Sequence, residues 1–346
     1  MYERKTNKMR KLKIWNTPWH LAHNYDLCMA LEKDADFYML VNYTRRWDEK
    51  LRPIPKNVHW VMNFEKGKYD FAILHVDQQC STEGLNKGML IKHMKETIKK
   101  VEPSLPIVFI NHATPVYPEN FQDGTRATGY KSEILRKEIL NIVGDDLMIT
   151  NSKQAAKDWK RGYPIWHGME EKEWMCFDEK EPRVATFISR AGIGDKYYNR
   201  SYLVAVMDEL RDRFGISLQW INTDGCFNAK DHKDYKEFLG KTLLYFNPTF
   251  ASPMPRTRTE AMLSGCCVLT TPHHDADEFI EDGVNGFLVP HNDPRGVAEN
   301  INILLKDGYK QAKEVGMRGR ETAIKTFNRE RYRQDWLDFI KTQLLK

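Results

Sequence analysis

Long apolar runs are missing from this sequence. No stretch of about 18 or more consecutive apolar residues occurs, and so the sequence predicts no transmembrane helix. The basic residues 1–13 also lack the apolar core of a secretory signal. Internal repeats and low-complexity runs are absent, while 41% of the residues are hydrophobic, which is enough for packed cores. With 346 residues, we expect a cytoplasmic protein of two ordinary domains.

Cysteine is scarce as well. The six cysteines are scattered, without the spacing of metal ligands or of a disulfide framework. This pattern fits a reducing compartment, in which thiols stay free. His20 and His23 have a spacing that allows metal binding, but no carboxylate or cysteine complements them, and so no metal site is predicted there.

Net positive charge is confined to one end of the chain. Residues 1–13 hold six Lys and Arg against Glu3, a net charge of +5 that equals the charge of the whole chain. We expect residues 1–12 to form a basic, flexible tail. Such a tail can make a peripheral contact with an anionic surface, although it is more often simply solvated. The zero net charge elsewhere argues against a broad phosphate-binding face.

Apolar strand patterns alternate with helical patterns along most of the chain, which is typical of parallel, doubly wound α/β domains. In a first series, strands are predicted at 12–15, 37–41, 70–75, 106–111 and 146–150, and helices at 25–32, 87–100 and 152–159. In a second series, strands are predicted at 183–188, 217–222, 243–247 and 268–271, and helices at 201–214 and 295–306.

A break between the two series divides the chain. Residues 13–165 are expected to form one domain and residues 183–328 another, with residues 166–182 as the linker, because that region carries proline, glycine and mixed charge. A last amphipathic helix is predicted from residue 329 to the end of the chain, with Tyr332, Trp336, Phe339 and Leu344 on its apolar face.

Residues 247–289 are the most informative stretch. Their order predicts a strand, a loop, a helix that reads from Thr259 and a cap at Gly265, followed by a buried strand. Glu260 would then lie at the mouth of the helix. A parallel sheet that runs into a helix N-terminus forms a natural pocket for a phosphorylated ligand.

This stretch resembles the donor-binding domain of retaining glycosyltransferases of the family-4 type, which have the GT-B fold. The resemblance implies an α/β protein with two Rossmann-like, doubly wound domains facing a central cleft. The first would be the acceptor-side domain, with the terminal helix 329–346 packed back on it, and the second would bind the nucleotide sugar. The residues that match in type, order and spacing are Glu260-Ala261-Met262, Gly265, Glu278-Phe279-Ile280 and Asn285-Gly286-Phe287-Leu288-Val289.

The resemblance also implies an activity. A hexosyl or pentosyl group would pass from a nucleotide-sugar donor to an acceptor hydroxyl by front-face displacement, and a phosphate oxygen would take the proton. The donor is a substrate, and neither a cofactor nor a metal is expected. The acceptor would be a saccharide, a lipid-linked molecule or a nucleic acid. Two alternatives stay open, namely a glycosyltransferase acting on hydroxylated DNA bases and a catalytically silent module that binds nucleotide sugars.

Candidate donor-binding residues surround the predicted helix. In the family, the glutamate that matches Glu260 binds the ribose hydroxyls. The family has a second glutamate eight residues earlier, where this chain has Ser252. Prolines replace the glycines of the loop between them, and we expect Arg256 and Arg258 to contact phosphate in place of backbone N–H groups. Thr259 is a further candidate.

Other candidates come from three separate segments. Asp275 lies in a loop expected beside the donor sugar. His112 ends the strand at 106–111, where the family often has a histidine that touches the transferred sugar and the phosphate. Arg190 and Lys196 follow the strand at 183–188 and resemble the basic pair that binds the diphosphate in the family. The predicted catalytic residues are therefore His112, Arg190 and Lys196.

Overall fold

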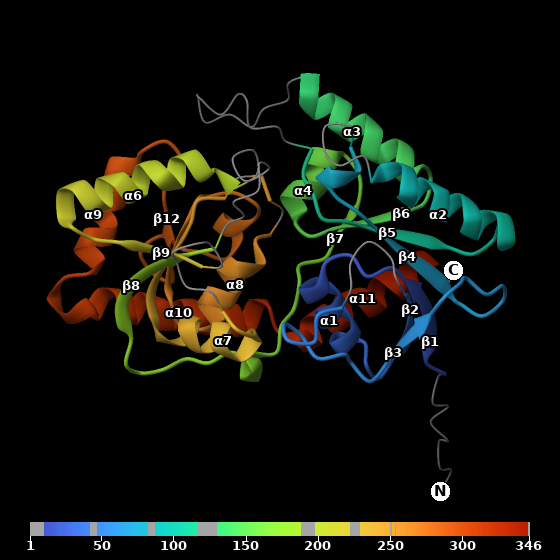
Figure 1. The fold of residues 1–346 in the computed structure, drawn as a ribbon, viewed down its shortest axis with the longest axis horizontal. Helices are drawn as coiled ribbons and strands as arrows, with labels where there is room; N and C mark the ends of the chain where they lie inside the picture. The colour runs from blue at the N-terminus through green and yellow to red at the C-terminus, as the bar shows by residue number, and fades with distance from the viewer. Residues whose placement is uncertain are drawn as a thin grey trace, which may run out of the picture.

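The chain forms two α/β halves that lie side by side (Figure 1). The computed structural model describes residues 10–41, 47–81, 87–115, 130–187, 198–221, 229–249, 251–252 and 254–344. Most of the expected basic tail lies outside these residues. Its end is described, and there Arg10 pairs with Asp70 while Lys11 pairs with Asp36.

The first half is a parallel sheet of seven strands in the order β3-β2-β1-β4-β5-β6-β7. Its helices cover both faces, which is the arrangement that buries a parallel sheet. The strands are β1 (Leu12–Asn16), β2 (Ala35–Leu40), β3 (Val58–Val61), β4 (Phe71–Val76), β5 (Ile107–Asn111), β6 (Leu147–Thr150) and β7 (Tyr163–Pro164). The helices are α1 (Leu21–Ala30), α2 (Gly88–Val101), α3 (Tyr130–Val143) and α4 (Lys153–Trp159), with a short 3₁₀ turn at Gln78–Cys80.

The second half is a parallel sheet of five strands in the order β12-β11-β10-β8-β9. The strands are β8 (Glu181–Thr186), β9 (Leu218–Trp220), β10 (Thr242–Asn247), β11 (Cys267–Thr270) and β12 (Phe287–Leu288). The helices are α6 (Arg200–Phe214), α7 (His232–Lys241), α8 (Arg256–Leu263), α9 (Pro294–Leu304) and α10 (Lys310–Thr326), with 3₁₀ turns at Glu171–Glu173, Ala276–Glu278 and Asp307–Tyr309.

Each sheet has an apolar cluster on both of its faces, because successive side chains of a strand point to opposite sides. In β1, Ile14 packs into one cluster and Trp15 into the other. In β10, Leu244 and Tyr245 divide in the same way. The architecture predicted from the alternating strands and helices, two parallel-sheet α/β domains, is confirmed.

The last helix returns to the first half. α11 (Arg329–Phe339), extended by a π-helical turn at Ile340–Leu344, packs against α1. Tyr332 and Trp336 share an apolar cluster with Leu27 of α1. The connection between the sheets runs from the end of β7 at Pro164 to the start of β8 at Glu181.

Several elements differ from the sequence prediction. Strand β3 and helices α3 and α10 were not predicted, and α1 begins at Leu21 rather than residue 25. The pattern of α10 is obscured by Gly316 and Gly319, which lower helix propensity. Both glycines allow close packing, because a Cβ atom would lie 2.6 Å from the carbonyl oxygen of Gly265 or of Asn285.

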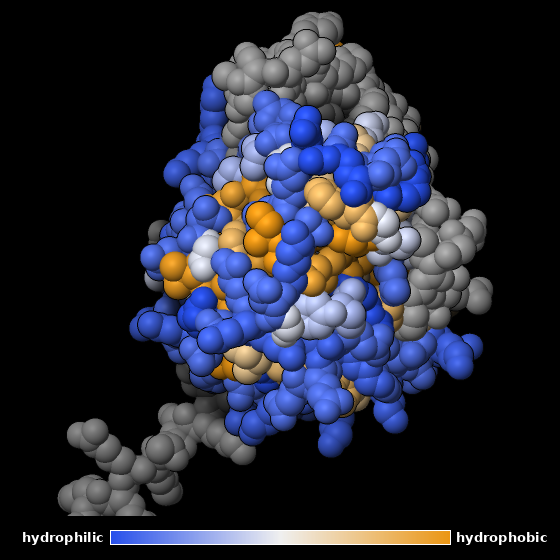
Figure 2. Space-filling view, turned by 90° about the vertical axis from the view of Figure 1, so that its left-hand side faces the viewer, coloured by the Kyte–Doolittle hydropathy of each residue, from blue (hydrophilic) through white to orange (hydrophobic). Residues whose placement is uncertain are grey.

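The outer end of the second half is mainly hydrophilic, with a smaller apolar area in its middle (Figure 2). Val204 of α6 and Ile303 of α9 are exposed apolar residues of the helices at this end. Among the described residues, no helix combines the length and apolar character needed to cross a membrane.

Candidate active site

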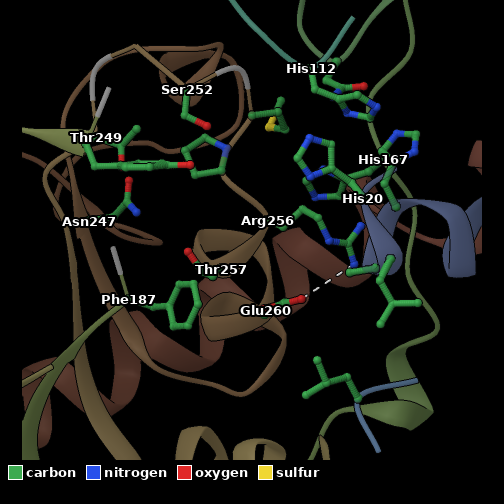
Figure 3. A pocket seen from close by; sticks show the side chains of 18 of the residues that line it. His20, His112, His167, Phe187, Asn247, Thr249, Ser252, Arg256, Thr257 and Glu260 are labelled. Carbon is green, nitrogen blue, oxygen red and sulfur yellow. Dashed lines mark hydrogen bonds and ion pairs between the residues drawn. The ribbon is translucent and has the colours of Figure 1, made fainter. Parts of the chain in front are cut away.

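A cavity of about 440 Å³ lies between the two halves. Figure 3 shows His20, His112 and His167 on one side of it, and Asn247, Thr249 and Ser252 on the other, with Arg256 and Glu260 of α8 between them. The cavity lies beyond the carboxyl ends of the parallel strands, where ligands of open α/β sheets bind. Of the predicted residues, His112, Ser252, Arg256 and Glu260 line it.

Helix α8 begins earlier than predicted. Pro255 is its N-cap residue, with φ of −57°, and the helix starts at Arg256 rather than Thr259. Pro255 makes no side-chain capping bond, and the residues of this end, Pro255, Arg256 and Thr257, line the cavity. The first-turn N–H groups of the helix therefore lie beside the cavity. Glu260 is therefore in the second turn, and its expected place at the mouth of the helix was wrong. The local reason is that proline has no N–H to lose at a helix start.

Glu260 is held by three side chains from both halves. Tyr235 of α7 donates its hydroxyl to Oε2 of Glu260 at 2.8 Å. The second oxygen, Oε1, has only long contacts, 3.4 Å to Nη2 of Arg52 and 3.6 Å to Nη2 of Arg256. One carboxylate oxygen is thus fixed by a short hydrogen bond, and the other can accept a stronger hydrogen bond from a ligand.

Arg256 bridges the two halves. Arg256 lies one turn before Glu260 on the same face of α8. Its Nη1 lies 2.5 Å from Oδ2 of Asp26 in α1. Burial acts against the charge of Arg256, but Asp26 and Glu260 outweigh it and raise the Arg256 pKa. Burial raises the pKa of Asp26, and Arg256 and Arg52 oppose that rise. Arg52, Arg256 and Glu260 of the cavity wall and the buried Asp26 behind it therefore form one charged cluster.

Arg258, Thr259 and Asp275 do not line the cavity. Arg258 donates to the carbonyl oxygens of His273 and His274, at 3.2 and 3.1 Å, and burial lowers its pKa to about 9. Its role in this structure is to hold the loop after β11. The Thr259 hydroxyl contacts a ring nitrogen of His167 at 2.9 Å.

Asp275 contacts the first half instead of the cavity. Its carboxylate accepts from the N–H groups of Lys153 at 2.5 Å and Gln154 at 2.8 Å, and from Trp166 Nε1 at 2.7 Å. It therefore caps α4 from the other domain, alongside the predicted cap Ser152, which accepts from Ala155. Its backbone has φ of 61°, a left-handed conformation that places the carboxylate toward α4.

His112 follows β5 and is held at both ring nitrogens. Its Nε2 lies 2.9 Å from Nδ1 of His75, and its Nδ1 lies 3.2 Å from Nδ2 of Asn151. His75 Nε2 contacts Oδ1 of Asn16 at 3.0 Å, and burial lowers the pKa of His75 far below its usual value. These contacts form a consistent chain of hydrogen bonds if both imidazoles are neutral and protonated at Nε2. His75 Nε2 then donates to Asn16, His112 Nε2 donates to His75 Nδ1, and His112 Nδ1 accepts from Asn151.

Arg190 and Lys196 lie outside the described residues. Nowhere in the described part of the chain do three or more His, Cys, Asp or Glu side chains have an arrangement that could hold a metal ion.

The prediction missed Asp26, Arg52, Asp77 and Tyr235 and attached no function to His20. Asp77 and His20 follow β4 and β1, which are neighbours in the sheet. The sequence signal for Asp77 and His20 was that each follows an apolar strand. Loops after neighbouring parallel strands meet at one edge of the sheet, so these two residues could have been expected to lie close together.

Comparison with known proteins finds a family match for part of the second domain. Residues 200–307 match the family model described as glycosyl transferases group 1. A segment of 89 residues is 28% identical to a protein described as colanic acid biosynthesis glycosyltransferase WcaL of Salmonella typhimurium. That segment is 26% of this chain, and it spans only 22% of WcaL.

Solved structures match over nearly the whole chain. HepE of Anabaena, solved in complex with UDP-glucose, has a TM-score of 0.67 at 15% identity, covering 96% of this chain and 100% of HepE. Sucrose-phosphate synthase of Thermosynechococcus elongatus has a TM-score of 0.68 at 14% identity, covering 96% of this chain and 98% of the synthase. The chain thus has the two-domain GT-B fold of these structures, and its second domain is similar to the glycosyl transferases of group 1.

Proposed function

We propose that this protein transfers a sugar from a nucleotide-sugar donor to an acceptor hydroxyl. The observation that carries the proposal is the placement of Glu260 and the N-terminus of α8 in one wall of the interdomain cavity. The family match over residues 200–307 includes this helix and supports the same activity. HepE, which shares the fold, is solved with UDP-glucose.

The donor is proposed to lie along α8. A ribose hydroxyl would donate to Oε1 of Glu260, the carboxylate oxygen without a close partner. The diphosphate would meet the N–H groups at the start of the helix and the guanidinium of Arg256. Arg256 lies four positions before Glu260, about 6 Å along the helix axis, so the two side chains lie on the same face of α8 and can meet adjacent parts of one donor molecule.

We further propose retention of the anomeric configuration by front-face displacement. This path needs no protein nucleophile, because the acceptor attacks from the side on which the diphosphate leaves. Asp231 and Glu260 are the carboxylates among the described residues that line the cavity. Asp231 caps α7 by accepting from the N–H of Asp234, and Glu260 is held by Tyr235. Both are therefore engaged, which favours a path without a covalent sugar–protein intermediate.

Ser252 remains the proposed point of sugar specificity. It lines the cavity where the resembling family has a glutamate that contacts the sugar. A hydroxyl is shorter and uncharged, so we expect a sugar with different hydroxyl or hydroxymethyl groups at this position. We propose a saccharide acceptor, since HepE is also solved with UDP and glucose. No observation favours a DNA acceptor, a lipid-linked acceptor or a silent binding module, and a cytoplasmic location is part of the proposal.

A donor panel tests the proposal. Calorimetric titration with UDP-glucose, UDP-galactose, UDP-N-acetylglucosamine, UDP-xylose and GDP-mannose should identify a donor that binds. Release of the nucleoside diphosphate should then be measured with mono- and disaccharide acceptors, and the product examined by proton NMR. We expect turnover and a product with the donor's anomeric configuration. Binding without turnover would favour the silent module, and an inverted product would refute front-face displacement. If no nucleotide sugar binds, both the proposed transferase and the silent nucleotide-sugar-binding module are refuted.

A further inference from the structure

Arg52 is a buried cation that the first domain places beside Glu260. Its side chain is 8% exposed, and the residue lines the cavity. Nη2 of Arg52 lies 3.4 Å from Oε1 of Glu260, the oxygen proposed to accept from the ribose. The proposed donor site of the second domain therefore includes a charged group that belongs to the first domain.

The loop that carries Arg52 is fixed on both sides of the cleft. It lies between β2 and β3, and the N–H of Arg52 donates to the carbonyl oxygen of Asp48 at 3.1 Å. Trp47 donates its Nε1 to the carbonyl oxygen of Arg52 at 2.8 Å. The carbonyl oxygen of Lys50 accepts from the N–H of His232, the first residue of α7, at 3.0 Å. These contacts hold the backbone around Arg52 against the second domain.

The protein engages the guanidinium of Arg52 only in part. Nη1 donates to the carbonyl oxygen of Leu51 at 2.8 Å, and the guanidinium carbon lies 5.9 Å from the centre of the Tyr25 ring. The contact of Nη2 with Glu260 is longer than the usual N–H···O distance of about 2.9 Å. Because a guanidinium carries several N–H donors in a planar fork, Nη2 can make a shorter hydrogen bond to an acceptor in the cavity.

Oε1 of Glu260 has the complementary property. Oε2 is occupied by the hydroxyl of Tyr235 at 2.8 Å, whereas Oε1 lies 3.4 Å from Arg52 and 3.6 Å from Arg256. The cavity wall therefore presents an acceptor oxygen and a donor nitrogen side by side. A hydroxyl can both donate and accept, so this pair matches two adjacent hydroxyl groups of one ligand.

We propose that Arg52 and Glu260 together bind the two adjacent hydroxyls of the donor's ribose. The inference rests on the proposed binding of a nucleotide sugar. One hydroxyl donates to Oε1 of Glu260, and the oxygen of the neighbouring hydroxyl accepts from Nη2 of Arg52. Each hydrogen bond is strengthened by the charge of the side chain that makes it. The nucleoside is thus held from both domains, and the substrates are sugars carried by ribonucleotides rather than by deoxyribonucleotides.

Burial makes this arrangement selective. The side chains of Arg52 and Glu260 are 8% and 5% exposed, so little water can take the place of a missing hydroxyl. A site built to bind a hydroxyl rejects the analogue that lacks it, because a buried charged group is then left without its partner. Loss of either the 2′- or the 3′-hydroxyl should therefore weaken binding about tenfold or more.

Binding of deoxynucleotides tests the inference. Calorimetric titration gives the Kd of UDP, 2′-deoxy-UDP and 3′-deoxy-UDP, or of the matching guanosine diphosphates if GDP-mannose is the donor found. In the wild-type protein, each deoxy form should bind about tenfold or more weakly than the ribonucleotide. Equal Kd values for the ribonucleotide and both deoxy forms would overturn the inference.

Two variants assign one hydroxyl to Arg52. Arg52→Met keeps the length of the side chain and removes its donors, so the ribonucleotide should bind more weakly and the penalty for one of the two deoxy forms should largely disappear. Arg52→Lys keeps the charge beside Glu260 without the planar fork, and it should reduce the same penalty. A merely structural or electrostatic role would weaken all three nucleotides alike. Wild-type ratios of the Kd values in either folded variant would overturn the inference.

Lys153→Gln is the matched control. Lys153 of α4 pairs with Glu278 of the second domain, so this change also removes an ion pair between the domains, but neither residue lines the cavity. The Kd values and their ratios should equal those of the wild-type protein.

Failure of the proposed function would look different. In that case the wild-type protein would bind none of the nucleotide sugars or nucleoside diphosphates, before any variant is compared. A protein that binds the ribonucleotide and keeps both deoxy penalties in Arg52→Met and Arg52→Lys would instead retain the proposed function and refute only the role of Arg52.

Discussion

Arg256 of the second domain and Asp26 of the first form an ion pair across the cleft, with Nη1 2.5 Å from Oδ2. Asp26 is 3% exposed, so the pair is shielded from water. Arg256 also contacts Glu260, the residue proposed to bind the ribose. The same guanidinium therefore joins the two domains and forms part of the proposed donor site.

Removing Asp26 should destabilise the protein strongly. Asp26→Ala leaves the buried guanidinium of Arg256 without one of its two carboxylates, and breaking a buried pair typically costs about 3–5 kcal/mol. Denaturant unfolding measures this cost. Asp36→Ala is the control, since Asp36 pairs with Lys11 near the surface, where a pair contributes about 0–1 kcal/mol. Equal unfolding free energies for the two variants would argue against a buried interdomain pair.

Removing Asp275 should loosen α4, although the two are on different domains. Asp275→Ala deletes the carboxylate that accepts from the N–H groups of Lys153 and Gln154. Loss of such a cap costs about 1 kcal/mol, so hydrogen exchange at these two amides should become several times faster. Asp293→Ala removes a cap within one domain, that of α9, and should leave α4 unaffected. Unchanged exchange at Lys153 would contradict the cross-domain cap.

Acid should destabilise the fold through its buried histidines. Burial lowers the pKa of His23 to about 3, whereas an unfolded histidine has a pKa of about 6.5. Between these values the unfolded chain binds a proton that the folded chain does not, so the unfolding free energy falls as pH falls. The slope contributed by His23 approaches about 1.4 kcal/mol per pH unit.

Urea unfolding between about pH 7 and about pH 5 measures this slope. His23→Gln should make it shallower, while His59→Gln, which changes a half-exposed histidine, should not. An unchanged slope in His23→Gln would show that His23 is not held neutral by burial.

Tyr235 should orient Glu260 for the donor. Burial, followed by the charge of Glu260, raises the Tyr235 pKa well above its usual value, so the hydroxyl stays a donor. Tyr235→Phe leaves Oε2 of Glu260 without its short hydrogen bond. We expect the donor Kd to rise about tenfold, which corresponds to about 1.4 kcal/mol. Tyr202→Phe also deletes a hydroxyl, one that donates to the carbonyl of Pro290, and should leave the Kd unchanged.

Local rules predicted much of the fold. Buried apolar runs identified β4, β5 and β10, and Gly265, with φ of 71°, ends α8 as expected from its sequence position. These features depend on neighbours within a few residues. The start of α8 was missed because prolines were read as loop residues, although Pro255 is compatible with a helix N-cap.

The partners of the site residues could not be predicted locally. Arg52 and Glu260 are 208 residues apart, and Asp26 meets Arg256 only because the domains face each other. Asp275 is a second example. The sequence predicts it beside the donor sugar, whereas in the structure its carboxylate accepts from the first N–H groups of α4 in the other domain. Contacts that depend on how two domains dock leave no periodic or spacing signal in the chain.

The central claim is that Glu260 binds the donor's ribose, and calorimetric titration of Glu260→Ala with the donor found in the panel tests it most directly. We expect donor binding to be nearly abolished, while Ser252→Ala, a change at another lining residue of the same cavity, alters it only mildly. Unfolding curves of both variants confirm that each is folded before titration. A folded Glu260→Ala that binds the donor with wild-type Kd would contradict the account.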